Sequence, residues 1–233
     1  MGRRTSVILC QPDERRGCSA CCGLFNLGDL SRSALTRYLM GAERRLDSPR
    51  PDDESVSLPG GEPVRDTGSH ICPYQGFLDG NPARPGCLLH PLHRGEDLRN
   101  RSLFGSTICA NYLCPAHYIF TDEHARILVE YVEDWYLYSI AIIDPESFVW
   151  MVDTLVGKIE IKLGGSDIAV LRRMLIRALE IHAENLARLR APVFHYALSE
   201  YLAHRGVYSL AAPGDAAGDE KARIIDECAR LCL

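Results

Sequence analysis

The stretch Cys18-Ser19-Ala20-Cys21-Cys22 is the first of three groups of cysteines in this chain, and it decides how the first half must fold. Cys72 and Cys87 form the second group, and Cys109 and Cys114 form the third. A hydrophobic core does not need so many thiols, whereas thiols gathered in this way usually bind soft metals or form disulfides. The choice between metal and disulfide therefore decides which kind of protein this is.

The overall composition is that of an ordinary globular protein, and it excludes several classes. The chain has 233 residues, 46% of them hydrophobic, and a formal net charge of -5, so it lacks the basic surplus of a nucleic-acid binder. The longest apolar run near a helix, residues 135–143, is too short to cross a membrane, which needs about 20 residues. Residues 6–10 are likewise too short for an export signal. We expect a cytoplasmic bacterial protein, in which reduced thiols favour metal over disulfides.

The two halves of the sequence differ in their patterning. In residues 1–120 the helical signal is one segment from Asp29 to about residue 46, followed by a Pro-, Gly- and acid-rich loop at 48–69. Residues 70–120 show little periodicity, so metal ligation would supply folding free energy that apolar burial cannot. Residues 121–233 show capping and stop signals typical of helices; we predict helices at 121–143, 145–163, 167–191, 193–204 and from 219 to the C-terminus. The predicted fold is mainly α, with a loop-rich, metal-stabilised cysteine module (1–120) packed on a bundle of about five helices (121–233).

The spacing of the cysteines favours more than one metal-binding point. Cys18 and Cys21 are three residues apart and can coordinate one ion together. Cys22 follows directly, and because adjacent side chains diverge, one small ion seldom takes both; two centres or a bulkier iron–sulfur cluster would use the pair more naturally. Short spacings that let two side chains bind one ion recur at Cys87-x2-His90 and at 109–114. The predicted metal ligands are Cys18, Cys21, Cys22, Cys72, Cys87, His90, Cys109 and Cys114. The alternatives are buried packing cysteines and a disulfide framework.

Four segments of the cysteine-rich half resemble a known family. Residues 18–22, Cys72-Pro-Tyr-x-Gly-Phe-Leu, Cys87-Leu-Leu-His-Pro and Cys109-x2-Tyr-x-Cys-Pro resemble the CxxCxxCC family of zinc- or iron-chelating proteins, the YkgJ-type cysteine-cluster proteins. The resemblance covers about residues 18–118 and implies a ligand role for the seven cysteines. The family often has an aromatic residue where His90 stands. The first group here reads CxxCC, one cysteine short, which leaves the number of ions open. A related branch methylates lysines of flagellin and is associated with an iron–sulfur cluster.

Cysteines outside the three groups have less specific interpretations. Cys10 is either a packing residue or a replacement for the missing cysteine of the first group. Cys228 and Cys232 share one face of a helix, where core packing is favoured over a further ligand pair or a redox pair. His182 and His195 fit helical patterns as ordinary core or surface residues. The aromatic residues between 131 and 138 are expected to pack against the cysteine-rich half.

Three functional hypotheses follow from these features. The first is a metal-binding protein that holds zinc or iron, including a 4Fe-4S cluster, and whose partner is another protein. The second is an enzyme that uses an iron–sulfur cluster or open iron site to modify a protein side chain, as the methylating relatives suggest. The third is a thiol–disulfide protein that uses Cys18 and Cys21. The nucleotide-binding, zinc-protease and hydrolase motifs are absent from the sequence.

Overall fold

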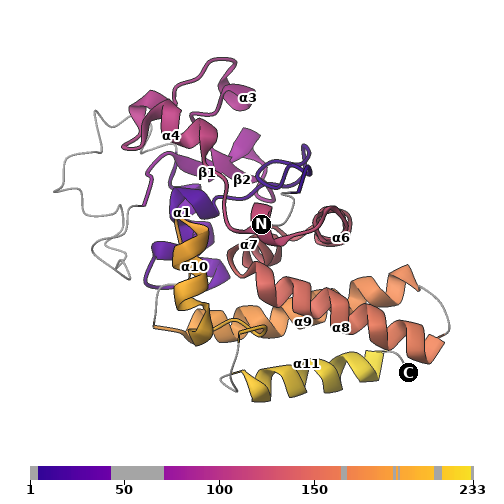
Figure 1. The fold of residues 1–233 in the computed structure, drawn as a ribbon. Helices are drawn as coiled ribbons and strands as arrows, with labels where there is room; N and C mark the ends of the chain where they lie inside the picture. Colours follow the sequence, from indigo (N-terminus) through magenta and orange to yellow (C-terminus); the bar gives the residue numbers. More distant parts are fainter. Residues whose placement is uncertain are drawn as a thin grey trace.

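The computed structural model describes residues 5–42, 71–163, 167–190, 193, 195–212 and 217–231. Helices dominate these ranges, and the only β-sheet in them is a pair of three-residue strands, which confirms the predicted mainly α class. The short elements between β1 and α4 lie in the upper part of Figure 1, and the long helices α8, α9 and α11 lie below them. The predicted loop at 48–69 falls outside the described residues.

The first half is built from short elements. The chain makes two 3-10 turns (Ala20–Cys22 and Leu24–Asn26), and the Ser31 hydroxyl then accepts a hydrogen bond from the Ala34 N–H at the start of the predicted first helix. That helix, α1, ends at Met40 with Gly41 at its C-cap; its predicted end, at about residue 46, falls outside the described residues. The other described helices and strands are β1 (Gln75–Phe77), β2 (Pro85–Cys87), α3 (Pro91–Arg94), α4 (Gly105–Asn111) and α5 (Ala116–Ile119), with further 3-10 turns at Leu78–Gly80 and Arg99–Arg101. The two strands are antiparallel.

The second half contains long helices, most of which begin where the sequence predicts. They are α6 (Asp122–Tyr131), α7 (Trp135–Ile143), α8 (Pro145–Leu163), α9 (Ile168–Arg188), α10 (Leu198–His204) and α11 (Gly218–Leu231). Pro145 is the first residue of α8, and the Asp167 carboxylate caps α9 by accepting from the Val170 N–H. These local signals are strong because the Asp167 carboxylate pairs a backbone N–H that the helix leaves unpaired, whereas Pro145 has no N–H to pair and a φ already suited to a helix.

Two predicted helix boundaries in this half are wrong. The segment 121–143 forms two helices, because the Asp134 carboxylate accepts the N–H groups of Tyr136 and Leu137 and so starts a new helix. The helix predicted to begin at 193 begins at Leu198 instead. Just before it, the Tyr196 N–H donates to the carboxylate of Glu200, in the first turn of α10, at 2.8 Å, a contact that stabilises the helix start at this later position.

We expect the Asp134→Ala substitution to lower the free energy of unfolding by about 1–2 kcal/mol, since it removes the N-cap of α7. It also removes the ion pair between Asp134 and Arg32. This pair is partly exposed and contributes little to the free energy of unfolding. Urea unfolding measures the change. The matched control is Glu133→Ala, an exposed neighbour that should cost no more than about 0.5 kcal/mol; equal costs for the two variants would contradict a capping role.

Helix α7 is the centre of the molecule. All nine of its residues are buried, so it packs on every side. Its Tyr136 hydroxyl donates to the Leu30 carbonyl at 2.8 Å, and its Tyr138 hydroxyl donates to the Leu9 carbonyl at 2.9 Å. The expectation that these aromatic residues pack against the cysteine-rich half is therefore confirmed. One hydrophobic cluster runs from Leu9 to Cys228 and joins both halves.

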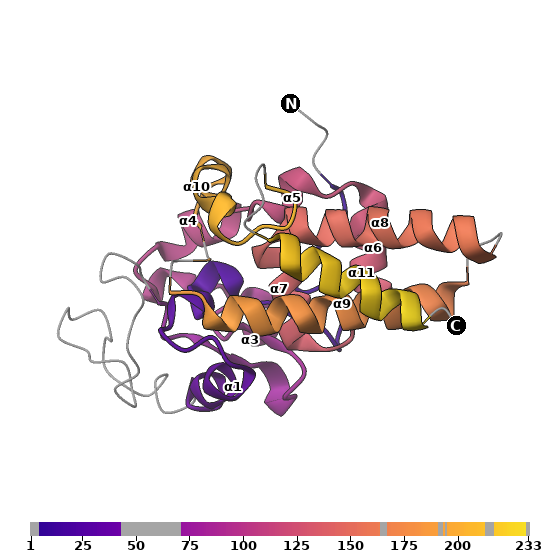
Figure 2. The same cartoon turned by 90° about the horizontal axis from the view of Figure 1, so that it is seen from below.

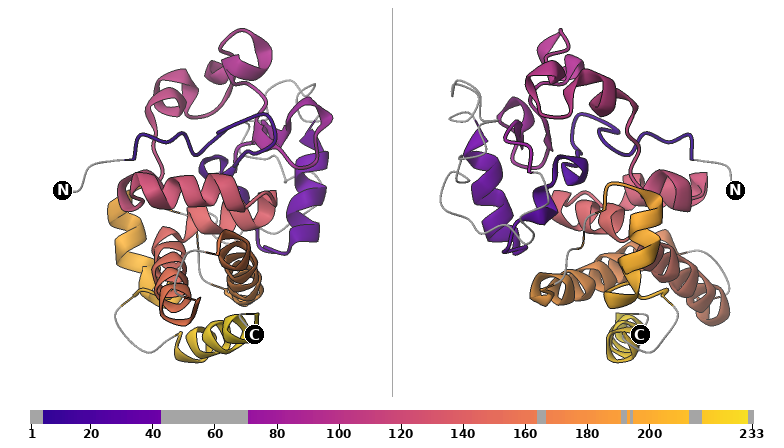
Figure 3. Two further views of the ribbon diagram at one scale, coloured as in Figure 1. Left: turned by 90° about the vertical axis from the view of Figure 1, so that its right-hand side faces the viewer. Right: turned by 60° about the vertical axis from the view of Figure 1, so that its left-hand side comes forward.

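Helices α8, α9 and α11 form the layer on the other side of α7. Figure 2 shows α11 lying along α9, and the left view of Figure 3 shows α8 and α9 nearly end-on with the yellow α11 beneath them. Cys228 of α11 is fully buried, with its sulfur 3.4 Å from the Met174 carbonyl, which confirms the packing role. Cys232 lies outside the described residues. Within the described ranges, none of the helices has the length and apolar character needed to cross a bilayer.

Candidate metal centre

Eight cysteines gather into two neighbouring sets of four on the side of the molecule above α7. We call Cys10, Cys18, Cys21 and Cys114 the first thiol group, because all four line one small cavity. We call Cys22, Cys72, Cys87 and Cys109 the second thiol group, because their thiols hydrogen-bond or interact electrostatically with one another. Cys21 of the first group also contacts Cys22, so the two groups adjoin. All seven predicted cysteine ligands belong to these groups. Cys10 is the member that the spacing argument did not single out.

The first thiol group surrounds a cavity of about 20 Å³. Cys21 lies in the first 3-10 turn, Cys18 lies two residues before the start of that turn, and Cys114 comes from the segment between α4 and α5. The N-terminal segment before the first 3-10 turn supplies Cys10, whose carbonyl accepts a hydrogen bond from the Cys18 N–H at 2.9 Å. Its neighbour Leu9 is buried and anchored by α7. Cys10 therefore reaches the cavity although it is exposed to solvent.

The second thiol group is assembled by backbone hydrogen bonds between distant segments. The Cys72 N–H donates to the Cys22 carbonyl at 2.8 Å. The buried Gln75 side-chain amide then donates to both of these residues, to the Cys22 carbonyl at 3.0 Å and the Cys72 carbonyl at 2.9 Å. Gln75 lies opposite Cys87 in the β1–β2 register. Helix α4 supplies the last member, Cys109.

The adjacent cysteines Cys21 and Cys22 belong to different groups because of the local backbone conformation. Both lie in the 3-10 turn Ala20–Cys22. A 3-10 helix has three residues per turn, so successive side chains point about 120° apart along it. Cys18 and Cys21 are three apart and line the same cavity. The thiols of Cys21 and Cys22 nevertheless hydrogen-bond each other, so the two groups touch at this adjacent pair.

In the first thiol group the protein environment favours protonated thiols. Burial raises the pKa of Cys18, and it raises the pKa of Cys114 to about 12, with the neighbouring Cys21 adding to the effect. Although Cys10 is exposed as a residue, the protein atoms around its thiol raise its pKa too. Backbone N–H groups act in the opposite direction: the Ala20 N–H lies 3.3 Å from the Cys18 sulfur, and N–H groups after Cys114 hydrogen-bond its thiol.

The second thiol group has a positive charge beside it. Hydrogen bonds with the thiols of Cys21, Cys72 and Cys87 raise the pKa of Cys22, and the same contact with Cys22 lowers the pKa of Cys87. The buried Arg99 guanidinium further lowers the pKa of Cys87. Arg99 is held by Asp97, with a 2.7 Å contact between the guanidinium and the carboxylate. A cation at this position offsets part of the negative charge of thiolates.

The donor set fits a soft metal, although the thiols do not have the geometry of a loaded site. Each group offers four sulfur ligands, the number that structural zinc sites use. Among the residues that the structure describes, no three His, Cys, Asp or Glu side chains form a ready-made metal-binding arrangement. The thiols of the second group hydrogen-bond one another instead. Metal binding would therefore require these thiols to lose their protons and reorient.

His90, the predicted imidazole ligand, has a structural role. Its Nδ1 accepts a hydrogen bond from the Leu92 N–H at 3.2 Å, so the side chain caps α3. Burial lowers its pKa, and the positive charge of Arg99 lowers it further. A ligand role for His90 stays a prediction.

No disulfide joins the cysteines that the structure describes. Cys18 and Cys21, the pair in the thiol–disulfide hypothesis, lie at a 3-10 turn and not at the start of an α-helix after a strand, where a thioredoxin-like motif lies. The comparisons with known proteins found no match: no family model fits the chain, and no curated protein or solved structure is similar to it.

Proposed function

We propose that this protein binds two metal ions, one in each thiol group, with zinc or iron as the metal. The observation that carries the proposal is the convergence of eight cysteines from four separated parts of the chain into two sets of four. An ordinary core does not need this arrangement, because a single cysteine packs as well as a cluster does. Two tetrathiolate sites account for all eight residues.

The size of the first cavity favours a single ion over an iron–sulfur cluster. Its volume is about 20 Å³, and a space of about 10–15 Å³ on this measure holds one water molecule. One zinc or iron ion fits in such a space, whereas a 4Fe-4S cluster with its four irons and four sulfides does not. The walls beside the thiols include the apolar Leu9 and Ile142, which are buried and leave little room for expansion.

The two groups differ in how they would offset negative charge. A divalent ion with four thiolates carries a net charge of about -2, which is costly to bury. In the first group, backbone N–H groups point at the sulfurs of Cys18 and Cys114. In the second group, Arg99 supplies a full positive charge beside Cys87. Hydrogen bonds and charges of this kind around the ligands tune metal affinity.

The bound ions would act mainly on folding. When bound, a tetrathiolate metal ion supplies folding free energy to a segment that cannot bury enough apolar surface by itself. The short elements between β1 and α5 are such a segment. Four thiols for each ion leave no open coordination position, which favours a structural or binding role over the protein-modifying enzyme. We extend the proposal to a cytoplasmic location, to another protein as partner, and to membership of the YkgJ-type family that residues 18–118 resemble.

We expect the adjacent substitutions Cys21→Ser and Cys22→Ser each to remove one ion, and a different one, because these residues belong to different groups. The protein would be purified anaerobically from cells supplied with iron and zinc, and metal content would be measured by elemental analysis. The wild type should hold two ions, each single variant one and the double variant none. Cys228→Ala, which removes a buried thiol outside both groups, is the matched control and should keep both ions.

Two results would contradict this proposal. If the purified protein holds neither metal, the thiol groups are not metal sites. If it contains iron with sulfide and a visible charge-transfer band, a cluster is bound and the single-ion argument from the cavity volume is wrong. Loss of both ions in Cys21→Ser alone, with Cys22→Ser unaffected, would show that the two groups are not separate sites.

A further inference from the structure

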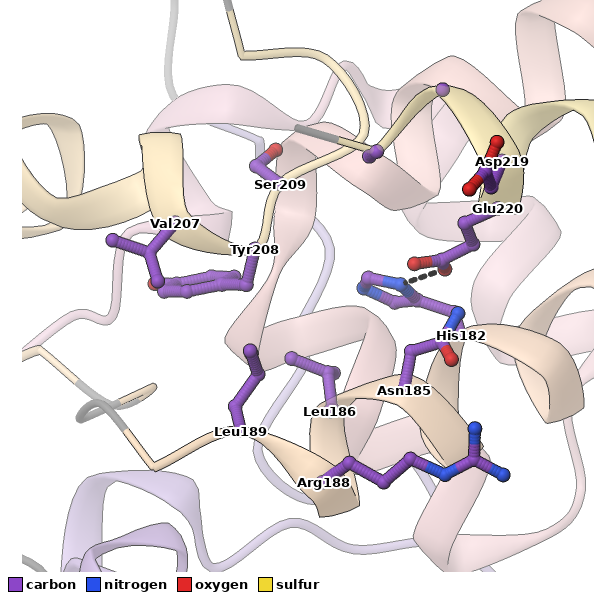
Figure 4. A pocket seen from close by; sticks show the side chains of 12 residues that line it. His182, Asn185, Leu186, Arg188, Leu189, Val207, Tyr208, Ser209, Asp219 and Glu220 are labelled. Atoms are coloured by element: carbon purple, nitrogen blue, oxygen red, sulfur yellow. Dashed lines mark hydrogen bonds and ion pairs between the residues drawn. The ribbon is translucent and has the colours of Figure 1, made fainter. Parts of the chain in front are cut away.

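A larger cavity lies in the helical half, between α9, the start of α11 and the segment after α10. Its volume is about 460 Å³, within the range of about 300–1,000 Å³ typical of small-molecule sites. Its walls come from three separate parts of the chain: His182, Asn185 and Leu186 from α9, Asp219 and Glu220 from the first turn of α11, and residues 207–209. Figure 4 shows these side chains around one space, and none of them is a predicted metal ligand.

One end of this cavity is apolar. Leu186 and Leu189 lie on one side of it, and Val207 and Tyr208 lie across from them (Figure 4). The Tyr208 ring is held in place, because its hydroxyl lies 2.8 Å from the His195 Nε2 and its ring stacks with the His195 ring. This end offers apolar side chains and a fixed ring against which a flat or aliphatic group can pack.

The other end contains a buried network of charged side chains. The His182 ring lies between two carboxylates, with Nδ1 2.6 Å from the Glu220 carboxylate and Nε2 2.9 Å from the Asp144 carboxylate. Asp144 is completely buried, and hydroxyl groups of Ser147 and Tyr201 also donate to it. Asp144 is therefore fully occupied inside the protein, and Glu220 is the carboxylate of this network that lies on the cavity wall.

The charges at this end favour a cation. A protonated His182 between two carboxylates leaves the network with one net negative charge. Asp219 adds a second carboxylate at the rim, and Arg188 adds one positive charge there. Both rim residues are exposed, so water screens them more strongly than it screens Glu220, whose side chain is 11% exposed. A compact cation beside Glu220 would therefore be stabilised, and an anion in the same place would be repelled.

We infer that this cavity binds a small organic amine, with the ammonium group beside Glu220 and Asn185 and the apolar part against Leu186, Leu189 and the Tyr208 ring. Neither the thiol groups nor a bound metal takes part in this binding. The Glu220 carboxylate and the Asn185 amide oxygen are acceptors suited to the three N–H donors of an ammonium group. The apolar end gives preference to amines with an aromatic or branched tail over ammonia.

The test uses the full-length, metal-loaded protein and two probes of similar shape but opposite charge. Phenethylamine carries an ammonium group on a phenyl tail, and hydrocinnamate carries a carboxylate on the same kind of tail. Isothermal titration calorimetry would be done with each. We expect saturable binding of phenethylamine with a Kd below about 1 mM, and at least tenfold weaker binding of hydrocinnamate.

Three variants connect this binding to the cavity. Leu189→Trp fills the apolar end without changing any charge and should abolish phenethylamine binding, whereas the matched control Leu202→Trp, at an exposed leucine of α10, should leave it unchanged. Arg188→Gln removes a positive charge at the rim and should strengthen binding a few-fold. The proposal is overturned if phenethylamine does not bind the wild type, if hydrocinnamate binds as tightly, or if Leu189→Trp binds the amine normally. Circular dichroism would verify that each variant is folded.

Discussion

Replacing Cys114 by serine is expected to remove one metal ion and to unfold the short elements of the first half while α7, α8, α9 and α11 stay helical. Cys114 is a buried member of the first thiol group and connects the segment after α4 to the hydrophobic cluster around α7. In zinc-finger peptides a structural zinc supplies roughly 10 kcal/mol or more of apparent folding free energy at neutral pH. The folding free energy lost with one such ion is larger than the apolar burial of a small loop-rich segment can replace.

The measurement combines metal analysis with amide hydrogen exchange. Faster exchange is expected in residues 5–27 and 71–118 of Cys114→Ser, and protection should persist in α7 and α9. Cys228→Ala, another buried cysteine, should lose neither metal nor protection in the first half. Unchanged protection in Cys114→Ser would show that metal does not hold this half together.

The same reasoning gives the direction of the pH dependence of metal binding. Burial raises the pKa of Cys18 and Cys114, so these thiols are protonated in the metal-free protein at neutral pH. An ion must therefore displace protons, and its apparent affinity should fall as the pH is lowered. Acidification of the wild type is expected to reproduce the exchange pattern of Cys114→Ser.

Replacing His182 by leucine is expected to lower the free energy of unfolding by about 3–5 kcal/mol, the usual cost of removing one partner from a buried ion pair. His182 joins Asp144, at the α7–α8 junction, to Glu220 in α11, so its loss leaves the buried Asp144 without its cation. The helix α11 should also detach more easily from α9. Urea unfolding at neutral pH measures the cost.

The pH dependence of this effect has a definite sign. Burial alone would lower the pKa of His182, but the hydrogen bonds and charges of Asp144 and Glu220 outweigh it and raise the pKa to about 9. A raised histidine pKa contributes stability fully below the unfolded value of about 6.5, and this contribution is lost as the pH rises through about 9. The difference in the free energy of unfolding between the wild type and His182→Leu should therefore be about 3 kcal/mol larger at about pH 6 than at about pH 9.5.

A matched substitution separates this network from general effects of losing a histidine. His124 is a histidine near the surface that contacts Asp153, an exposed residue, so His124→Leu should cost much less than His182→Leu. If the two variants are equally stable, or if the stability difference between wild type and His182→Leu does not change with pH, the buried imidazolium does not carry the stability assigned to it.

The sequence by itself determined the features that depend on neighbouring residues. The starts of α1, α8 and α9 could be predicted because Ser31, Pro145 and Asp167 act within one helical turn of their own positions. The mainly α class followed from the periodicity of the second half. Seven members of the two thiol groups were recognisable because cysteines at short spacing share a function that composition alone does not explain.

Only the tertiary structure decided which residues meet across the chain. Cys10 joins the first thiol group because Tyr138 of α7 anchors the preceding residue, a contact between positions 129 residues apart. The assignment of Cys72 to the second group depends on Gln75, whose amide bridges two distant carbonyl groups. His182 has an ordinary helical context, and its carboxylate partners lie 38 residues away in either direction. Spacing along a sequence carries no information about such pairs, because packing brings them together only when the whole core forms.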